Sequence, residues 1–156
     1  MRCAAPTFSL VGSLDPSAMI LALNQLIARH EILRTRYGHD ADGPYQEVQE
    51  DTDPRLSWID LSEDPRALVG PTLTAIMRAA YARPLDLERH GPLQSWIFKL
   101  RPAMWILALI VDHIALDNRS VQLLASEIFG NYRRNCAGLP DPRPPLALQY
   151  ADYAIW

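Results

Sequence analysis

The 156-residue sequence has only two cysteines, and its four histidines are scattered along the chain. Cys3 and Cys136 have neither a metal-binding nor a redox spacing, so we expect both to be free thiols in a reducing compartment, the cytoplasm. The histidines also lack the intervals typical of metal ligands, so we expect no metal. Neither a disulfide-stapled secreted domain nor a metal centre is favoured.

Long hydrophobic runs and an excess of one charge are also missing. The longest apolar run, Met104–Val111, is far too short to cross a bilayer, and no charged-then-apolar leader precedes it. The formal net charge of −3 provides no general attraction for nucleic acid or an anionic membrane surface. We therefore expect a cytoplasmic protein that binds neither. With 49% hydrophobic residues, the chain has enough apolar side chains for the core of one domain.

The spacing of apolar residues predicts alternating strands and helices. Asp15-Pro16 resembles a helix start, and the tight turns Asp42-Gly43 and Arg101-Pro102 each separate two predicted strands. Gly70-Pro71 delays the start of the second helix. The predicted strands are 7–14, 33–38, 45–50, 56–61, 94–100 and 104–111, and the predicted helices are 16–30, 65–82 and one that follows residue 120. The predicted strands are more numerous than a parallel sheet would have if a helix connected each strand to the next. This favours an α+β fold.

The stretch "VDHIALDNRS", residues 111–120, brings ionisable side chains to the end of the most apolar predicted strand. His113 is the residue there that exchanges a proton near neutral pH without help. Asp117 is close enough in sequence for a turn to bring it back toward His113, and Asn118 or Ser120 can cap the following helix. From the residues alone, two readings stay open: a catalytic turn, or the polar cap of the next helix.

Several motifs resemble those of one family. "DHIALDN" is similar to the His-His-x-x-x-Asp-Gly signature of condensation domains from nonribosomal peptide synthetases. "RHEILRTRY", residues 29–37, resembles their Arg-His-Glu-x-Leu-Arg-Thr motif, and "QYADYAIW", residues 149–156, resembles Tyr-x-Asp-Tyr-Ala-x-Trp. Between them, "RPLDLERHGPLQ" is similar to Pro-Phe-Asp-Leu-x-x-Gly-Pro-Leu, with one extra residue before Gly91. The motifs occur in the family's order over nearly the whole chain.

The resemblance implies a lobe of the chloramphenicol acetyltransferase type, with a mixed, mostly antiparallel sheet covered by helices. It implies that His113 is the catalytic residue of an acyl transfer that joins a carrier-bound acyl donor to a carrier-bound amine. Asp117 is structural in the family and pairs with an arginine, for which Arg34 is the candidate. The partners implied are acyl or peptidyl carrier domains and other synthetase domains. No cofactor is expected on the chain itself, because the substrates travel on the phosphopantetheine arms of the carriers.

The sequence departs from the signature at two positions: Asp112 replaces its first histidine, and Asn118 replaces its glycine. Asp112, Asp117 and Ser120 also match the signature of heterocyclisation domains, an aspartate, four residues, a second aspartate, two residues and a serine. A heterocyclisation lobe is therefore an alternative. A further alternative is a non-catalytic condensation-like module that docks a carrier domain or a tailoring enzyme.

Length is a further departure, since a complete condensation domain is nearly three times as long as this sequence. The resemblance implies that residues 1–156 form the N-terminal lobe and that residues 139–156 begin the linker to a second lobe. In the family, two such lobes enclose the substrate tunnel between them. One lobe alone would leave a bound intermediate open to water and poorly oriented, so we expect catalysis to need the second lobe. The face that meets that lobe is expected to carry uncovered apolar surface.

Overall fold

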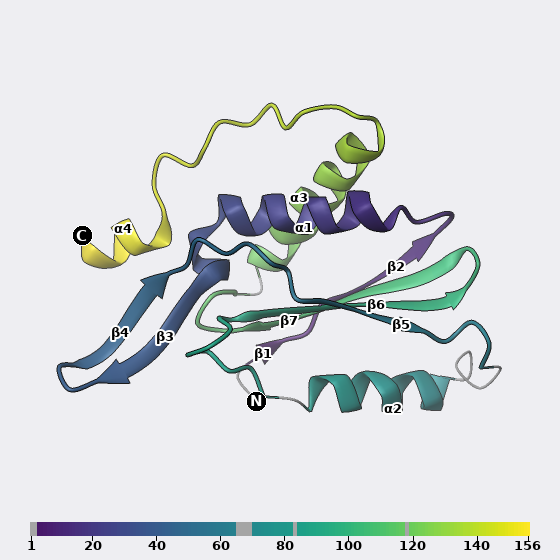
Figure 1. Ribbon diagram of the computed structural model, residues 1–156, viewed down its shortest axis with the longest axis horizontal. Helices are drawn as coiled ribbons and strands as arrows, with labels where there is room; N and C mark the ends of the chain where they lie inside the picture. Colours follow the sequence, from purple (N-terminus) through teal and green to yellow (C-terminus); the bar gives the residue numbers. More distant parts are fainter. Residues whose placement is uncertain (1–2, 65–69, 83, 118) are drawn as a thin grey trace.

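The computed structural model describes residues 3–64, 70–82, 84–117 and 119–156. A five-stranded sheet lies at its centre, with α1 (Pro16–Arg29) and α3 (Ser120–Cys136) on one face and α2 (Gly70–Tyr81) on the other (Figure 1). The sheet runs in the order β1 (Cys3–Ala4), β7 (Met104–Asp112), β6 (Leu93–Arg101), β5 (Leu56–Asp60), and β2 (Thr7–Val11) also pairs with β7. This is the α+β lobe predicted from the sequence.

Only one pair of strands in this sheet is parallel. β5 and β6 run in the same direction because α2 connects them, whereas β1, β2 and β6 each run antiparallel to β7. The predicted turn between β6 and β7 occupies Pro102-Ala103, one residue later than expected. The helix predicted over 65–82 begins at Gly70, as its glycine and proline suggested; residues 65–69 lie outside the described part of the chain.

The period of two along β6 and β7 divides the core between the two faces of the sheet. Ile97, Leu107 and Leu109 point toward α1 and α3, while their neighbours Phe98 and Ala108 point toward α2. All five side chains are fully buried, and β7 is accordingly apolar without interruption over residues 104–111. β7 is therefore the central strand, and its end places the motif turn at a fixed position.

A hairpin stands apart from the main sheet. β3 (Thr35–Asp40) follows a short 3-10 helix, η1 (Glu31–Arg34), and pairs antiparallel with β4 (Gly43–Val48). Figure 1 shows the hairpin projecting from the end of the molecule at which α4 (Tyr150–Ile155) lies. Its two-residue turn is 41–42, one residue earlier than predicted, and Gly43 follows with a φ of 121°.

No helix in the described residues is long and apolar enough to cross a membrane.

Candidate functional site

The turn after β7 closes on itself through the Asp112 side chain. Its carboxylate accepts the backbone N–H of Ile114 at 2.9 Å, and its backbone carbonyl accepts the N–H of Ala115 at 2.9 Å. The thiol of Cys3 on β1 lies 3.8 Å from the other carboxylate oxygen. Burial and the adjacent Asp112 charge raise the pKa of the Cys3 thiol. Asp112 thus stabilises the turn in which the next residue, His113, lies.

His113 lies on the exposed side of this turn with one ring nitrogen engaged. Its Nδ1 is 3.1 Å from the backbone carbonyl of Leu116, which is itself buried. A carbonyl can only accept, so in the neutral ring Nδ1 carries the proton and Nε2 keeps its lone pair. The imidazole is exposed, and that lone pair is the part of the turn suited to take a proton from a substrate.

Asp117 hydrogen-bonds Ser120, the first residue of α3. Its Oδ1 accepts the backbone N–H of Ser120 at 2.8 Å and the Ser120 hydroxyl at 2.6 Å. These hydrogen bonds favour the charged carboxylate and lower the pKa of Asp117. Asp117 and Ser120 are therefore brought together, in the capping role that was one of the two readings of the sequence. Asn118 lies outside the described residues.

The expected ion pair between Arg34 and Asp117 is not formed in the part of the chain that the structure describes, and this corrects the sequence analysis. Arg34 donates to the backbone carbonyl of Gln49 and lies 3.5 Å from the Glu31 carboxylate. Its two terminal guanidinium nitrogens face Gln49 and Glu31, whereas its Nε has no hydrogen-bond partner among the described residues. Asp117 Oδ1 accepts from Ser120, so the two side chains are held by different partners.

We expect Asp117→Ala to lower the melting temperature because the first turn of α3 loses its side-chain acceptor. Caps of this kind are typically worth enough to shift the Tm of a chain this size by about 2–4 °C. Calorimetry on the purified chain measures the shift. Asp117→Asn is the matched variant and should retain most of the Tm. If Asp117→Ala melts like the unchanged chain, Asp117 does not hold the helix start.

A hollow opens beside the motif turn, and the sequence analysis did not predict it. Its volume is about 430 Å³, and it is lined by Tyr37, Pro44, Tyr45, Gln46, Ile114 and Tyr150. Burial raises the pKa of Tyr37, and the nearby Tyr150 hydroxyl and Asp112 carboxylate raise it further. Tyr150 belongs to the motif "QYADYAIW", so the sequence marked this residue. Nothing in the motif indicates that Tyr150 lies beside the β3–β4 hairpin.

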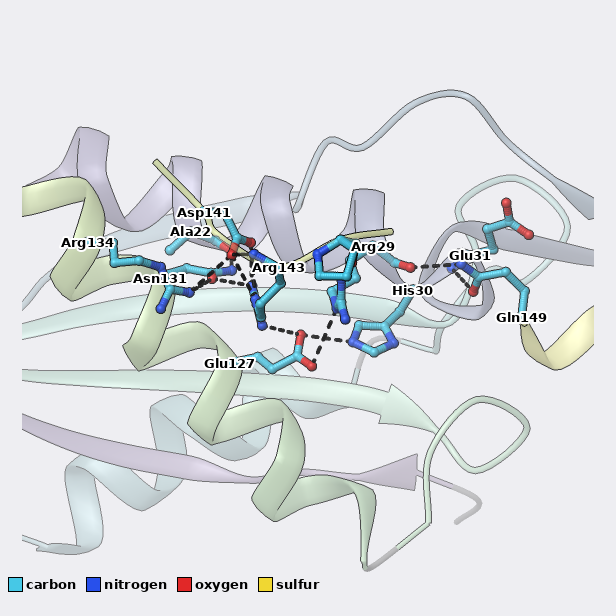
Figure 2. Close-up of polar contacts among 11 residues, drawn as sticks. Ala22, Arg29, His30, Glu31, Glu127, Asn131, Arg134, Asp141, Arg143 and Gln149 are labelled. Carbon is cyan, nitrogen blue, oxygen red and sulfur yellow. Dashed lines mark hydrogen bonds and ion pairs between the residues drawn. The ribbon is translucent and has the colours of Figure 1, made fainter. Parts of the chain in front are cut away.

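The segment between α3 and α4 runs back over α1 and is fastened there by ion pairs (Figure 2). Glu127 on α3 is the centre: its carboxylate lies 2.9 Å from His30 Nε2 and 3.2 Å from Arg143 Nη1. Arg29 Nε lies 3.8 Å from the same side chain. The Glu127 side chain is only 11% exposed, so the guanidinium groups of Arg29 and Arg143 and the hydrogen bond from His30 replace much of its lost hydration.

Arg143 extends the network along the segment. It donates to Asp141 Oδ2 and to the side-chain oxygen of the fully buried Asn131, each at 2.6 Å. The Arg143 hydrogen bond holds the pKa of Asp141 well below its usual range. At the far end of the segment, Gln149 donates to the Arg29 carbonyl at 3.0 Å and its side chain caps α4 (Figure 2). Residues 139–149, here named the strap, thereby place α4 beside η1 and the hairpin.

The sheet, its helical layers and the turn after its central strand together define a lobe of the chloramphenicol acetyltransferase type. The chain belongs to the condensation domain family, since the family described as "Condensation domain" matches residues 4–156. It is 35% identical to a protein of Salinispora arenicola (strain CNS-205) described as "Probable non-canonical nonribosomal peptide synthetase (NRPS) CymA", over 94% of this chain and 2% of that protein. Chondramide synthase cmdD of Chondromyces crocatus is 34% identical over 95% of this chain and 4% of the synthase.

Solved structures show the same lobe. The X-domain in its complex with OxyB from teicoplanin biosynthesis superposes with a TM-score of 0.88 at 33% identity, over 100% of this chain and 33% of that chain. The first condensation domain of the calcium-dependent antibiotic synthetase, in complex with a substrate analogue, gives 0.80 at 26% identity, over 91% of this chain and 34% of that chain. This chain thus spans about a third of these solved chains and a few per cent of its curated relatives.

Proposed function

We propose that this chain is the N-terminal lobe of a domain that forms an amide bond between a carrier-bound acyl donor and a carrier-bound amine. The observation that carries the proposal is the exposed His113, whose Nδ1 is held by the Leu116 carbonyl and whose Nε2 is left to accept a proton. Membership of the condensation domain family supports the substrate class, and so does similarity to peptide synthetases. We expect the domain to work in the cytoplasm.

The chemical step follows from the two substrates. The amine nitrogen of the acceptor attacks the thioester carbonyl of the donor, and the C–S bond breaks as the C–N bond forms. His113 Nε2 takes the proton that the nitrogen loses and passes it to the departing phosphopantetheine sulfur, which leaves as a thiol, so the imidazole returns to its neutral form. The products are an amide on the acceptor carrier and a free thiol on the donor carrier. The lobe needs no bound cofactor in this scheme, because both substrates arrive on carrier domains.

The proposal includes a second lobe because His113 is exposed to solvent on the lobe that this chain forms. The side chains that α4 exposes support this: Tyr153 is 66% exposed, Ile155 85% and Trp156 96%. Tyr150, Tyr153 and Trp156 form a ladder with ring centroids 6.2 and 6.4 Å apart. An aromatic face of this kind is suited to packing against another protein surface. The strap fixes that face on the same end of the lobe as the hairpin.

The test is to join residues 1–156 to the second lobe of a related condensation domain and assay transfer between loaded carrier domains. Mass spectrometry of both carriers should show the amide on the acceptor and the free thiol on the donor. The unjoined 156-residue chain is the control and should transfer at the uncatalysed rate. A folded two-lobe protein that binds both carriers and yields no amide contradicts the proposal.

A docking module is the second candidate. The X-domain seen in complex with OxyB matches this chain at higher identity and TM-score than the antibiotic-synthetase condensation domain does. In this case the joined protein binds a partner enzyme and transfers nothing. A heterocyclisation lobe, based on Asp112, Asp117 and Ser120, is separated from both by its product, because a ring formed with a Cys, Ser or Thr side chain loses one water relative to the amide.

A further inference from the structure

A glycine and a tyrosine fit together across the β3–β4 hairpin. Gly38 and Tyr45 are direct cross-strand partners. A β-carbon added at Gly38 would lie 2.5 Å from two atoms of the Tyr45 side chain, Cζ and Oη, which is far inside contact distance. The ring therefore occupies the space that any other side chain at position 38 would need. Aromatic residues cover strand glycines in this way and are held in one orientation by them.

This orientation makes Tyr45 a wall of the hollow next to His113. Ile114, the residue after His113, lines the hollow, and so do Tyr37, Tyr45 and Tyr150, which come from β3, β4 and α4. Tyr45 and Ile114 are 44% and 45% exposed, so apolar surface faces the opening. Asp112, the residue before His113, is close enough for its charge to act on Tyr37. One chain neighbour of His113 thus lines the hollow, and the charge of the other acts on a residue of its wall.

The lining of the hollow indicates the chemistry that it accepts. Its six residues are three tyrosines, a proline, a glutamine and an isoleucine, and none of these six carries a formal charge. Aromatic rings and an aliphatic side chain contact flat apolar groups well and offer a charged group no ion partner. The volume of about 430 Å³ is ample for one aromatic side chain.

We propose that this hollow is a subsite for an aromatic side chain of the substrate, and that Tyr45, oriented by Gly38, selects for it. The inference rests on the proposed function in one respect: the side chain belongs to the substrate whose reactive atoms reach His113. It goes further by naming the substrate class and the residue pair that recognises it. A ring on such a surface gains about threefold to tenfold in affinity over a methyl group.

The test uses the 156-residue chain and measures binding, so it does not depend on transfer. The probes are N-acetyl-L-phenylalaninamide, whose blocked amine resembles a donor, and L-phenylalaninamide, whose free amine resembles an acceptor; the alanine analogues are the references. NMR titration gives the affinities and the residues that shift. At least one phenylalanine probe should bind at least threefold more tightly than its alanine analogue, with shifts at Ile114 and Tyr45. Preference for the blocked or the free amine assigns the hollow to the donor or the acceptor.

The variants isolate the Gly38–Tyr45 pair. Gly38→Ala and Tyr45→Ala should each bring the phenylalanine preference below twofold, whereas Tyr45→Phe should keep it. Gly130→Ala in α3 is the matched control, because a β-carbon there meets nothing closer than 3.7 Å. If Gly38→Ala does not fold, the double variant with Tyr45→Ala removes the clash and should fold without the preference. Equal binding of phenylalanine and alanine probes, or a preference that survives Tyr45→Ala, overturns the proposal whatever the transfer assay shows.

Discussion

Replacing His113 by alanine in the two-lobe domain should slow amide formation by about 10²–10⁴, the usual range for loss of a general base. The physical reason is that Nε2 is the basic atom at the exposed side of the turn, held by the Nδ1 contact to Leu116. The loss should appear in kcat, because the substrates are bound through their carriers and not through the imidazole. Single-turnover assays with preloaded carriers separate the chemical step from carrier binding.

Two further variants make this result specific. His90→Ala alters an exposed histidine outside the motif turn, in the loop before β6, and should leave the rate within twofold. Asp112→His restores the first histidine of the family signature, but it removes the acceptor that closes the turn onto the Ile114 N–H. A rise in rate means that the carboxylate limits transfer, and a fall means that the turn needs it. If transfer by His113→Ala equals that of the unchanged domain, His113 is not the base.

Replacing Glu127 by alanine should lower the free energy of unfolding by about 3 kcal/mol, because removing one partner of a largely buried ion pair typically costs this much. Arg29 and Arg143 lose their shared carboxylate, and His30 loses its hydrogen-bond partner, in a site where the Glu127 side chain is 11% exposed. For a chain of this length the loss corresponds to a fall in Tm of about 6–12 °C. Chemical denaturation followed by circular dichroism measures it.

Local readouts and a matched variant test the cause. Hydrogen exchange should rise first in the strap and α4, because Arg143 and Gln149 fasten them to α1 and α3. Glu50→Ala removes a carboxylate from an exposed position and should change stability by less than about 0.5 kcal/mol. Arg143→Ala combined with Glu127→Ala should cost less than the sum of the two. Strict additivity, or unchanged exchange in the strap, contradicts the network as its source.

Local patterns were sufficient wherever a short stretch determines its own conformation. Asp15-Pro16 predicted the start of α1, and the structure has Asp15 accepting the N–H of Ala18 at 3.0 Å with Pro16 as the first helical residue. The apolar runs of β6 and β7 and the turn between them were predicted to within a residue or two. The family motifs also led correctly to the fold, because they occur in the family's order from residue 29 to residue 156.

The predictions failed where partners are distant in sequence. His30 and Glu127 are 97 residues apart, and no spacing rule connects them. β1 has only two residues and is defined solely by its pairing with β7, so it has no period to detect. The sequence predicts a linker over residues 139–156, after a run of prolines, whereas the structure has the helix α4 there. Arg34 was assigned to Asp117 by resemblance, whereas Arg34 donates to the Gln49 carbonyl and Asp117 accepts from Ser120.

The turn after β7 is shaped by atoms that take no part in its proposed chemistry. Its bends are closed by the Asp112 and Asp117 carboxylates and by the Leu116 carbonyl, while His113 Nε2 closes none of them. Selection for folding and selection for reactivity therefore act on different atoms of the same ten residues. Replacing the imidazole removes the reactive Nε2 and the Nδ1 contact to Leu116, but it leaves the Asp112 and Asp117 hydrogen bonds that close the rest of the turn. A descendant of the domain can therefore lose the reaction and keep the lobe for another task.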